Sequence, residues 1–182
     1  MFTDGRSKRV VFIAHCLLNQ NAISDGTAVY PAAFQDVIKA LLSADIGIVQ
    51  LPCPELCCLG LDRGNIHGAE HPVVRENTRI RNEMMKPDIY GHLLDLVDGV
   101  MEQIAEYRKY GFEIVGIVGV NRSPSCGVDT TSDFDSEIEG KGLFMEALSN
   151  RLKGETPPIP MLGIKGTDSI TGRLQSLLQT GG

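Results

Sequence analysis

One stretch, residues 113–127, constrains the fold of this chain more than any other. Its first half, residues 113–120, is a nearly continuous run of β-branched residues and glycine, which is typical of a strand buried on both faces in a parallel sheet. Its second half ends in Ser-Pro-Ser-Cys-Gly, a sequence that can continue neither a strand nor a helix. The stretch therefore predicts a buried strand that delivers Cys126 to a tight loop at its carboxyl end.

Two other apolar runs end in the same way. Cys16 follows the run at residues 9–15, and Cys53 follows the run at residues 46–52. The carboxyl ends of parallel strands meet at one edge of a sheet, and open α/β sheets bind their ligands at that edge. If the three strands are parallel neighbours, the thiols of Cys16, Cys53 and Cys126 converge, and we expect the functional site there.

The remaining pattern predicts a single α/β domain in three layers, with a mostly parallel, doubly wound, Rossmann-like sheet. A helix between the first two strands makes them a βαβ unit, whose strands are parallel. We expect one domain over residues 1–182, with a frayed leader at residues 1–8. Apolar periodicity places the helix between the first two strands at residues 31–44. It also predicts helices at residues 87–110, 143–152 and 168–178 and a fourth strand at residues 159–164.

Three polar segments are predicted to lack regular structure. Residues 65–86 are expected to form an irregular excursion or lid over the sheet edge, because long loops in compact domains are usually functional or mobile. Residues 128–140 are expected to form an acidic, solvated loop. The loop at residues 17–26, beside the first cysteine, is either a plain surface connection or part of a pocket that Asn19, Asn21 or Asp25 would help to line.

Length and charge narrow the function classes. The chain has 182 residues, which suits one domain with a sizeable core. Its formal net charge of −6 argues against a large nucleic-acid interface but leaves a free base or nucleoside as a substrate. No apolar run approaches the length that spans a membrane, and the polar N-terminus lacks the apolar core of a signal peptide. These features predict a cytoplasmic protein.

Five cysteines in a reducing compartment are more often metal ligands or reactive thiols than disulfide partners. Three thiolates without a fourth suit a metal centre with one open coordination position. Two centres satisfy this description: zinc held by three cysteines, and a 4Fe-4S cluster with one open iron. The wide separation of Cys16, Cys53 and Cys126 in the sequence disfavours a structural zinc site, but spacing alone does not separate the two centres.

Competing uses of the thiols are weaker. Cys126 could act as a nucleophile with His15 as its base, but alternation along the strand places His15 on the opposite side from Cys16. Cys57 and Cys58 could form a redox pair, although adjacent cysteines form strained disulfides. These two cysteines are equally well explained as small apolar residues.

Four motifs resemble those of the DUF523 family, which includes the thiouracil desulfidases, and especially its desulfidase-related, TudS-like branch. Ser-Pro-Ser-Cys-Gly combined with Cys-Pro-Glu is specific, whereas either alone is weak. The motifs span about the first nine-tenths of the chain in the family's order. They are residues 15–19 (His-Cys-Leu-Leu-Asn), residues 51–55 (Leu-Pro-Cys-Pro-Glu) with 59–63 (Leu-Gly-Leu-Asp-Arg), residues 122–127 (Arg-Ser-Pro-Ser-Cys-Gly) and residues 140–146 (Gly-Lys-Gly-Leu-Phe-Met-Glu).

The resemblance implies a single DUF523-like α/β domain with a 4Fe-4S cluster held by the motif cysteines Cys16, Cys53 and Cys126. It also implies an enzyme, a desulfidase that removes sulfur from a thiolated nucleobase or similar thiocarbonyl small molecule and releases sulfide without net redox change. The implied partner is a small molecule, with no nucleic-acid polymer and no membrane. Either Cys57 or Cys58 could replace one expected ligand.

Within such a reaction, Glu55 is the candidate general acid/base, because Pro54 holds it two residues from a proposed ligand. The plain alternative is a carboxylate at a helix N-terminus. Ser123 and Ser125 are further candidates for the catalytic site, where they, and Arg63, would orient the substrate. A second hypothesis uses the same three cysteines in a non-catalytic metal-binding, sulfur-binding or redox-sensing protein.

Overall fold

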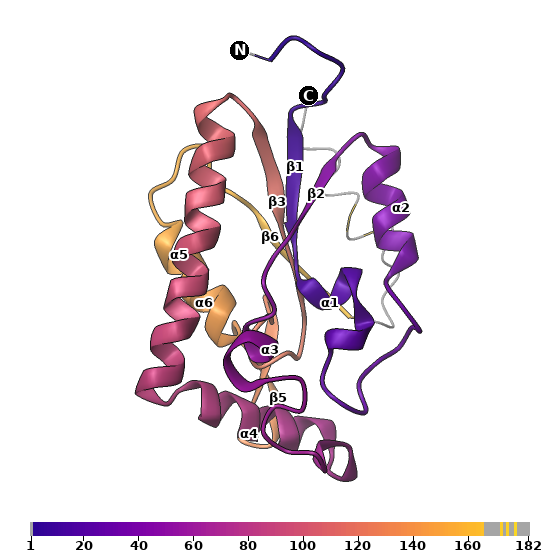
Figure 1. Ribbon diagram of the computed structural model, residues 1–182, viewed down its shortest axis with the longest axis vertical. Helices are drawn as coiled ribbons and strands as arrows, with labels where there is room; N and C mark the ends of the chain where they lie inside the picture. The colour runs from indigo at the N-terminus through magenta and orange to yellow at the C-terminus, as the bar shows by residue number, and fades with distance from the viewer. Residues whose placement is uncertain (1, 166–171, 173, 175–176, 178–182) are drawn as a thin grey trace.

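Four parallel strands form the central sheet of this protein (Figure 1). The structure, a computed structural model, describes residues 2–165 together with residues 172, 174 and 177. The strand order is β2-β1-β3-β6, and each neighbouring pair is parallel. The prediction of four parallel strands in one sheet is confirmed. Their bounds are β1 (Arg9–Ile13), β2 (Gly47–Gln50), β3 (Glu113–Val120) and β6 (Met161–Ile164).

Helices cover both faces of this sheet. α2 (Gln35–Ser43) lies on one face, and α5 (Pro87–Lys109) and α6 (Leu143–Arg151) lie on the other (Figure 1). None of the helices in the described residues combines the length and apolar character that crossing a membrane requires. The fold is therefore the predicted three-layer, doubly wound, Rossmann-like α/β class. One stripe of α5 faces the sheet, because its buried residues recur every three or four positions: Leu93, Val97, Val100 and Ile104.

The chain reverses its direction across the sheet between β1 and β3. From β1 it passes through α2 to the edge strand β2, and it then crosses back to β3 on the other side of β1. Sheets with such a reversal have a crevice beyond the carboxyl ends of the strands. Three segments start at this edge: α1 (His15–Leu18) after β1, α3 (Pro54–Leu59) after β2, and the loop after β3.

Several predicted boundaries shift by a few residues. The helix predicted at residues 31–44 starts only at Gln35, because the preceding residues pair with the loop after β1, with Phe34 N donating to Leu17 O (2.9 Å). The first strand ends at Ile13, since His15 already belongs to α1. The helix predicted at residues 168–178 falls outside the described residues except at 172, 174 and 177.

The segment predicted as an irregular excursion contains a regular helix, α4 (Val73–Met84). That prediction was wrong because α4 has few apolar residues and buries polar ones, Glu76 and Asn77, alongside Ile80 and Met84. Their polar groups have partners in the folded chain, for example Asn77 Nδ2, which donates to Ser132 Oγ (3.1 Å). α4 lies beyond the carboxyl ends of the strands, where the excursion was expected (Figure 1).

The predicted acidic loop at residues 128–140 is an antiparallel hairpin of β4 (Thr130–Asp133) and β5 (Ser136–Glu139). Its two turn residues, Phe134 and Asp135, have positive φ angles of 49° and 54°, as expected for a tight hairpin turn. The turn is anchored on α4, because Asp135 N donates to Thr78 Oγ1 (2.9 Å). A short hairpin rich in charged residues carries no apolar alternation, and so its strands escaped prediction.

The loop that carries Cys126 is clamped against the start of α6. The first turn of α6 has no side-chain cap, and its backbone N–H groups donate instead to loop carbonyls, with Leu143 N to Pro124 O (3.0 Å) and Phe144 N to Ser125 O (3.1 Å). A Cβ atom at Gly142 would lie 2.4 Å from the carbonyl carbon of Ser125. Only glycine at this position allows so close an approach.

Gly142→Ala is therefore expected to destabilise the protein by about 1–3 kcal/mol, because the atoms it would meet are backbone atoms that cannot rotate away. Urea unfolding followed by circular dichroism measures the change. Gly99→Ala in α5 is the matched control, since no atom lies within 4 Å of a Cβ there and alanine stabilises a helix interior by roughly 0.5–1 kcal/mol. Unchanged stability of Gly142→Ala would contradict the clamped position of the loop.

Candidate functional site

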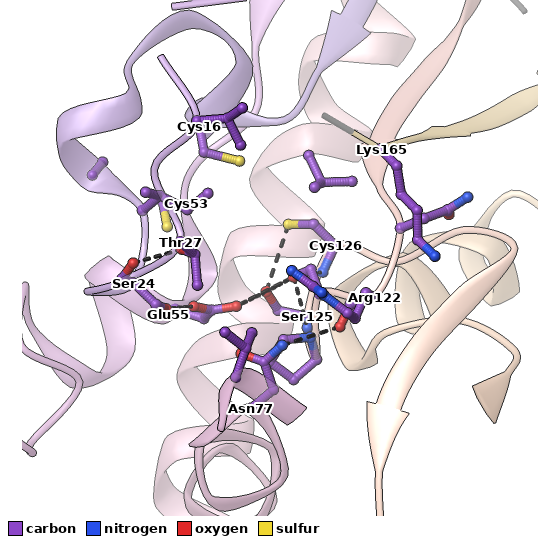
Figure 2. A pocket seen from close by; sticks show the side chains of 18 of the residues that line it. Cys16, Ser24, Thr27, Cys53, Glu55, Asn77, Arg122, Ser125, Cys126 and Lys165 are labelled. Atoms are coloured by element: carbon purple, nitrogen blue, oxygen red, sulfur yellow. Dashed lines mark hydrogen bonds between the residues drawn. The ribbon is translucent and has the colours of Figure 1, made fainter. Parts of the chain in front are cut away.

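Cys16, Cys53 and Cys126 line one pocket of about 280 Å³ at the carboxyl edge of the sheet. Each thiol leaves the sheet just after a strand: Cys16 in α1 after β1, Cys53 directly before α3, and Cys126 in the loop after β3. Figure 2 shows the three sulfur atoms pointing into the same space. The structure thus brings together the three cysteines that the sequence singles out, beside the reversal of strand order where such sheets bind ligands.

Fixed turns carry the first two thiols. Cys53 is the N-cap residue of α3, where its Sγ accepts a hydrogen bond from Leu56 N (3.4 Å) and Pro54 occupies the first turn. The carbonyl of Cys16 accepts a hydrogen bond from the side-chain amide of Gln20 (2.7 Å), a buried residue. Local hydrogen bonds therefore fix the backbone of Cys16 and the sulfur of Cys53.

The loop of Cys126 is shaped by side chains that bond to its backbone. Ser123 Oγ accepts hydrogen bonds from the N–H groups of Ser125 (3.3 Å) and Cys126 (3.0 Å). Just upstream, Asn121 Oδ1 accepts from the N–H group of Val128 (3.3 Å). Such bonds from serine and asparagine close tight turns, and here they hold the Cys126 thiol at the pocket.

Burial makes all three thiols poor acids in the protein alone. Burial, followed by the proximity of Cys53 and Glu55, raises the pKa of Cys16 to about 12. Burial and then Glu55 raise the pKa of Cys53 to about 11. The pKa of Cys126 is raised for the same first reason, and next by Cys16 and Cys53. The thiols are close enough to disfavour one another's ionisation, which a bound metal cation would offset.

Glu55 lies at the centre of a buried hydrogen-bond network. Its Oε1 accepts from the hydroxyls of Ser125 (2.6 Å) and Ser123 (3.3 Å). Its Oε2 accepts from Ser24 Oγ (3.1 Å) and from Arg63 Nε (3.3 Å). One carboxylate therefore joins segments from all three strand ends, and Figure 2 shows Glu55 between Ser24 and Ser125.

The two predicted serines flank the Glu55 carboxylate in the wall of the pocket. Ser125 is 1% exposed and Ser123 is half-buried, and both line the pocket with Glu55. A hydroxyl donates one hydrogen bond and accepts others, so either serine can donate to Glu55 Oε1 while it accepts from a group in the pocket. The arrangement is suited to moving a proton between the pocket and the carboxylate.

Other lining residues had weaker signals or none in the sequence. The polar loop at residues 17–26 contributes to the pocket through Ser24, whereas the predicted Asn19, Asn21 and Asp25 are not among the lining residues. Asn77 reaches the pocket from α4, whose existence the polar sequence concealed. The apolar part of the wall comes from separate segments that no local pattern links: Ala22, Ile23, Val29, Phe34, Val73 and Val120.

Cys57 and Cys58 are not among the residues that line the pocket. Cys57 is exposed and Cys58 is half-buried on α3. Burial, and then the neighbouring Cys57, raise the pKa of Cys58 to about 11, so its thiol has little of the thiolate character that reactivity requires. The structure therefore assigns these two cysteines a place outside the cluster of three thiols.

His15 is engaged away from Cys126. One ring nitrogen contacts the side-chain amide of Gln50 and the other that of Asn19 (3.5 Å). Neither ring nitrogen has the Cys126 thiol among its described hydrogen-bond partners. Together with the raised pKa of Cys126, this arrangement gives no support to a thiolate nucleophile activated by His15.

The donor set of the pocket consists of three soft thiols, those of the buried Cys53 and Cys126 and of the half-buried Cys16. Thiolates of this kind bind zinc or iron–sulfur clusters in preference to hard cations. Within the described part of the chain, no three His, Cys, Asp or Glu side chains are drawn together closely enough to hold a single metal ion. Cys16, Cys53 and Cys126 all line the pocket, so they are the candidates to hold a cofactor larger than one metal ion.

Comparisons with known proteins give two similarities. No family model matches the chain. An uncharacterised protein of Methanocaldococcus jannaschii is 28% identical over 148 residues, which cover 79% of this chain and 86% of that protein. A solved structure of TudS, a 4Fe-4S-dependent thiouracil desulfidase, has a TM-score of 0.44 and 16% identity, and the match covers 93% of this chain and 97% of that one.

Proposed function

We propose that this protein is an iron–sulfur-cluster-dependent desulfidase. It would remove sulfur from a thiolated nucleobase or a similar thiocarbonyl small molecule and release it as sulfide. The observation that carries the proposal is the meeting of three thiols, from three separate strand ends, in one pocket with the Glu55 network. The four motifs shared with the DUF523 family support it, and we assign the chain to that family as one domain.

Cys16, Cys53 and Cys126 would hold three irons of a 4Fe-4S cluster. The cluster would supply a fourth iron without a protein ligand, a Lewis acid for the thiocarbonyl sulfur. Three thiols suffice for this design, and a fourth protein ligand would close the position that a substrate needs.

The reaction balances as a hydrolysis. The oxygen of water replaces the sulfur on the substrate carbon, and the two protons of water leave with the sulfur as hydrogen sulfide. Glu55 accepts a proton from the attacking water at Oε1, through the hydroxyl of Ser123, and returns a proton to the departing sulfur. Ser125, at 2.6 Å from Oε1, holds the carboxylate in place.

The pocket suits a small, flat substrate. Its volume of about 280 Å³ lies just below the usual range for small-molecule sites, and the proposed cluster would occupy part of it. Apolar side chains, including Val29, Phe34 and Val73, form one part of the wall and the polar network of Glu55 forms another. A thiolated pyrimidine offers an apolar ring face to the first and a thiocarbonyl carbon to the second.

Protein purified and reconstituted without oxygen is expected to be brown, to absorb near ~400 nm and to contain about four irons per chain. It should then release sulfide from a thiolated pyrimidine such as 4-thiouracil and form the matching oxo-pyrimidine in equal amount. A sulfide assay and chromatography measure the two products, and protein without iron is the control.

Two outcomes would contradict this proposal. If the protein contained zinc and no iron, the three thiols would hold zinc instead of a cluster. A brown protein that releases no sulfide from any thiolated base would favour the second hypothesis, a metal-binding or redox-sensing protein that uses the same thiols.

A further inference from the structure

We infer that Arg63 is a positioning residue that fixes Cys53 and Glu55 and supplies the positive charge beside them. The chemical role inferred for Arg63 depends on the proposed function, and the evidence for it is the geometry of the Arg63 side chain. Arg63 is 2% exposed and lines the pocket. A buried cation is retained in a fold only when its charge and its hydrogen-bond donors are matched.

Every N–H group of the Arg63 guanidinium has an acceptor. Two of these acceptors belong to the proposed site, two to the turn of Arg63 itself, and one to the loop that follows Cys16. The side chain therefore ties the segment after β1 to the segment after β2. The acceptors are Glu55 Oε2 for Nε (3.3 Å), Gly60 O (3.0 Å) and Leu61 O (2.8 Å) for Nη1, and Ala22 O (2.5 Å) and Cys53 Sγ (3.7 Å) for Nη2.

The set of hydrogen bonds donated by the guanidinium distinguishes two possible roles of Arg63. A substrate-binding arginine needs a free N–H group facing the pocket, and Arg63 has none left. A positioning arginine needs several fixed acceptors in different segments, which Arg63 has. The planar fork of five donors cannot be reproduced by lysine, which has a compact ammonium group.

The backbone of Arg63 is also held in an unusual conformation. Its φ angle is +55°, and the glycines on either side of the turn, Gly60 and Gly64, have φ angles of +84° and +70°. A left-handed conformation at a non-glycine residue persists where surrounding contacts impose it. One of these contacts comes from α4, where Arg79 Nη2 donates to the carbonyl of Arg63 (2.8 Å).

The charge of Arg63 has a consequence for a cluster in this pocket. The thiolates that would hold a cluster are anionic, and Arg63 is a buried cation in direct contact with both Glu55 and one of the three sulfur atoms. Local charge and hydrogen bonds to the sulfurs set the reduction potential of a cluster. Loss of the charge disfavours the reduced, more negative state, so the midpoint potential must move to a more negative value.

The test compares wild-type protein with Arg63→Gln, Arg63→Lys and Arg108→Gln, each loaded anaerobically with iron and sulfide. Arg108 is the matched control, because it is also paired with a glutamate, Glu155, and with a backbone carbonyl, but does not line the pocket. Iron content and the midpoint potential of the cluster are measured. Arg63→Gln is expected to hold less iron and to show a more negative potential, whereas Arg108→Gln matches the wild type.

Arg63→Lys keeps the charge and loses the fork, so its potential should lie closer to that of the wild type than the potential of Arg63→Gln. Full iron content and an unchanged potential in Arg63→Gln would overturn the inference. So would equal shifts in Arg63→Gln and Arg108→Gln. Arg63→Lys keeps the comparison possible if Arg63→Gln does not fold.

A failure of the proposed function gives a different result. If the wild type takes up no iron, the proposed cluster is wrong, and the positioning of Glu55 is then tested on the metal-free protein. Urea unfolding of Arg63→Gln, Glu55→Gln and the double variant forms a cycle. If the double variant loses less stability than the sum of the two single losses, the pairing of Arg63 with Glu55 is supported. If the losses are additive, the pairing is overturned.

Discussion

Replacing Cys16, Cys53 or Cys126 with alanine is expected to lower the iron content of the loaded protein from about four irons per chain to almost none. Each substitution removes one of the three thiols that line the pocket. The described lining contains no further cysteine that could take its place. Iron and acid-labile sulfide, measured together with the absorbance near ~400 nm, give the result.

Cys57→Ala and Cys58→Ala are the matched controls, and each should keep most of the iron. They change the same residue type on the adjacent helix, outside the pocket. Circular dichroism of the metal-free variants separates loss of a ligand from loss of the fold. If Cys58→Ala lost its iron while Cys53→Ala kept it, the assignment of the ligand after β2 would be wrong, although three thiolates could still hold the cluster.

Glu55→Gln is expected to slow sulfide release by about 100-fold or more while the iron content stays unchanged. Glutamine has the same size as glutamate, and its amide oxygen can still accept from Arg63 Nε. Its amide nitrogen can donate to the hydroxyls of Ser123 and Ser125, which accept as well as donate. The network therefore persists, and only the proton acceptor is lost. Initial rates with a thiolated pyrimidine measure the effect.

Glu155→Gln provides the control for that experiment, because Glu155 is also paired with an arginine but does not line the pocket. Its turnover should match that of the wild type. If Glu55→Gln turned over at the normal rate, water or another group would have to transfer the proton. The acid/base role assigned to Glu55 would then be wrong. Loss of iron together with activity would instead make Glu55 a residue that holds the site together.

The central strand β3 was predictable because its residues have one environment. Residues 114–119 are β-branched or glycine and are all buried, so composition alone identifies the strand. α4 could not be found in this way, because Glu76 and Asn77 are buried with polar partners outside the helix, Asn65 for the first and Ser132 for the second. A hydrophobic pattern records contact with an apolar core and gives no signal where a helix packs through hydrogen bonds.

The candidate site was predictable to the extent that its residues stand next to a strand end or in a turn motif. Cys126, Ser123 and Ser125 share one short motif, and Cys53 and Glu55 share another. Ser24 reaches Glu55 only through tertiary packing, as does Asn77 with the loop after β3. The sequence also suggested that Arg63 orients the substrate, and only the count of its five donors points to a different role.

The three thiols come from three different connections between strands of one sheet. This origin would require the protein to fold before it binds the proposed cofactor. A zinc finger gathers its ligands from a short local segment, so metal binding and folding are one event. Here β1, β2 and β3 must first be paired in register before Cys16, Cys53 and Cys126 share a pocket. A nascent or truncated chain that lacks β3 offers at most part of this pocket, so delivery of the proposed cofactor would require the finished fold rather than the growing chain.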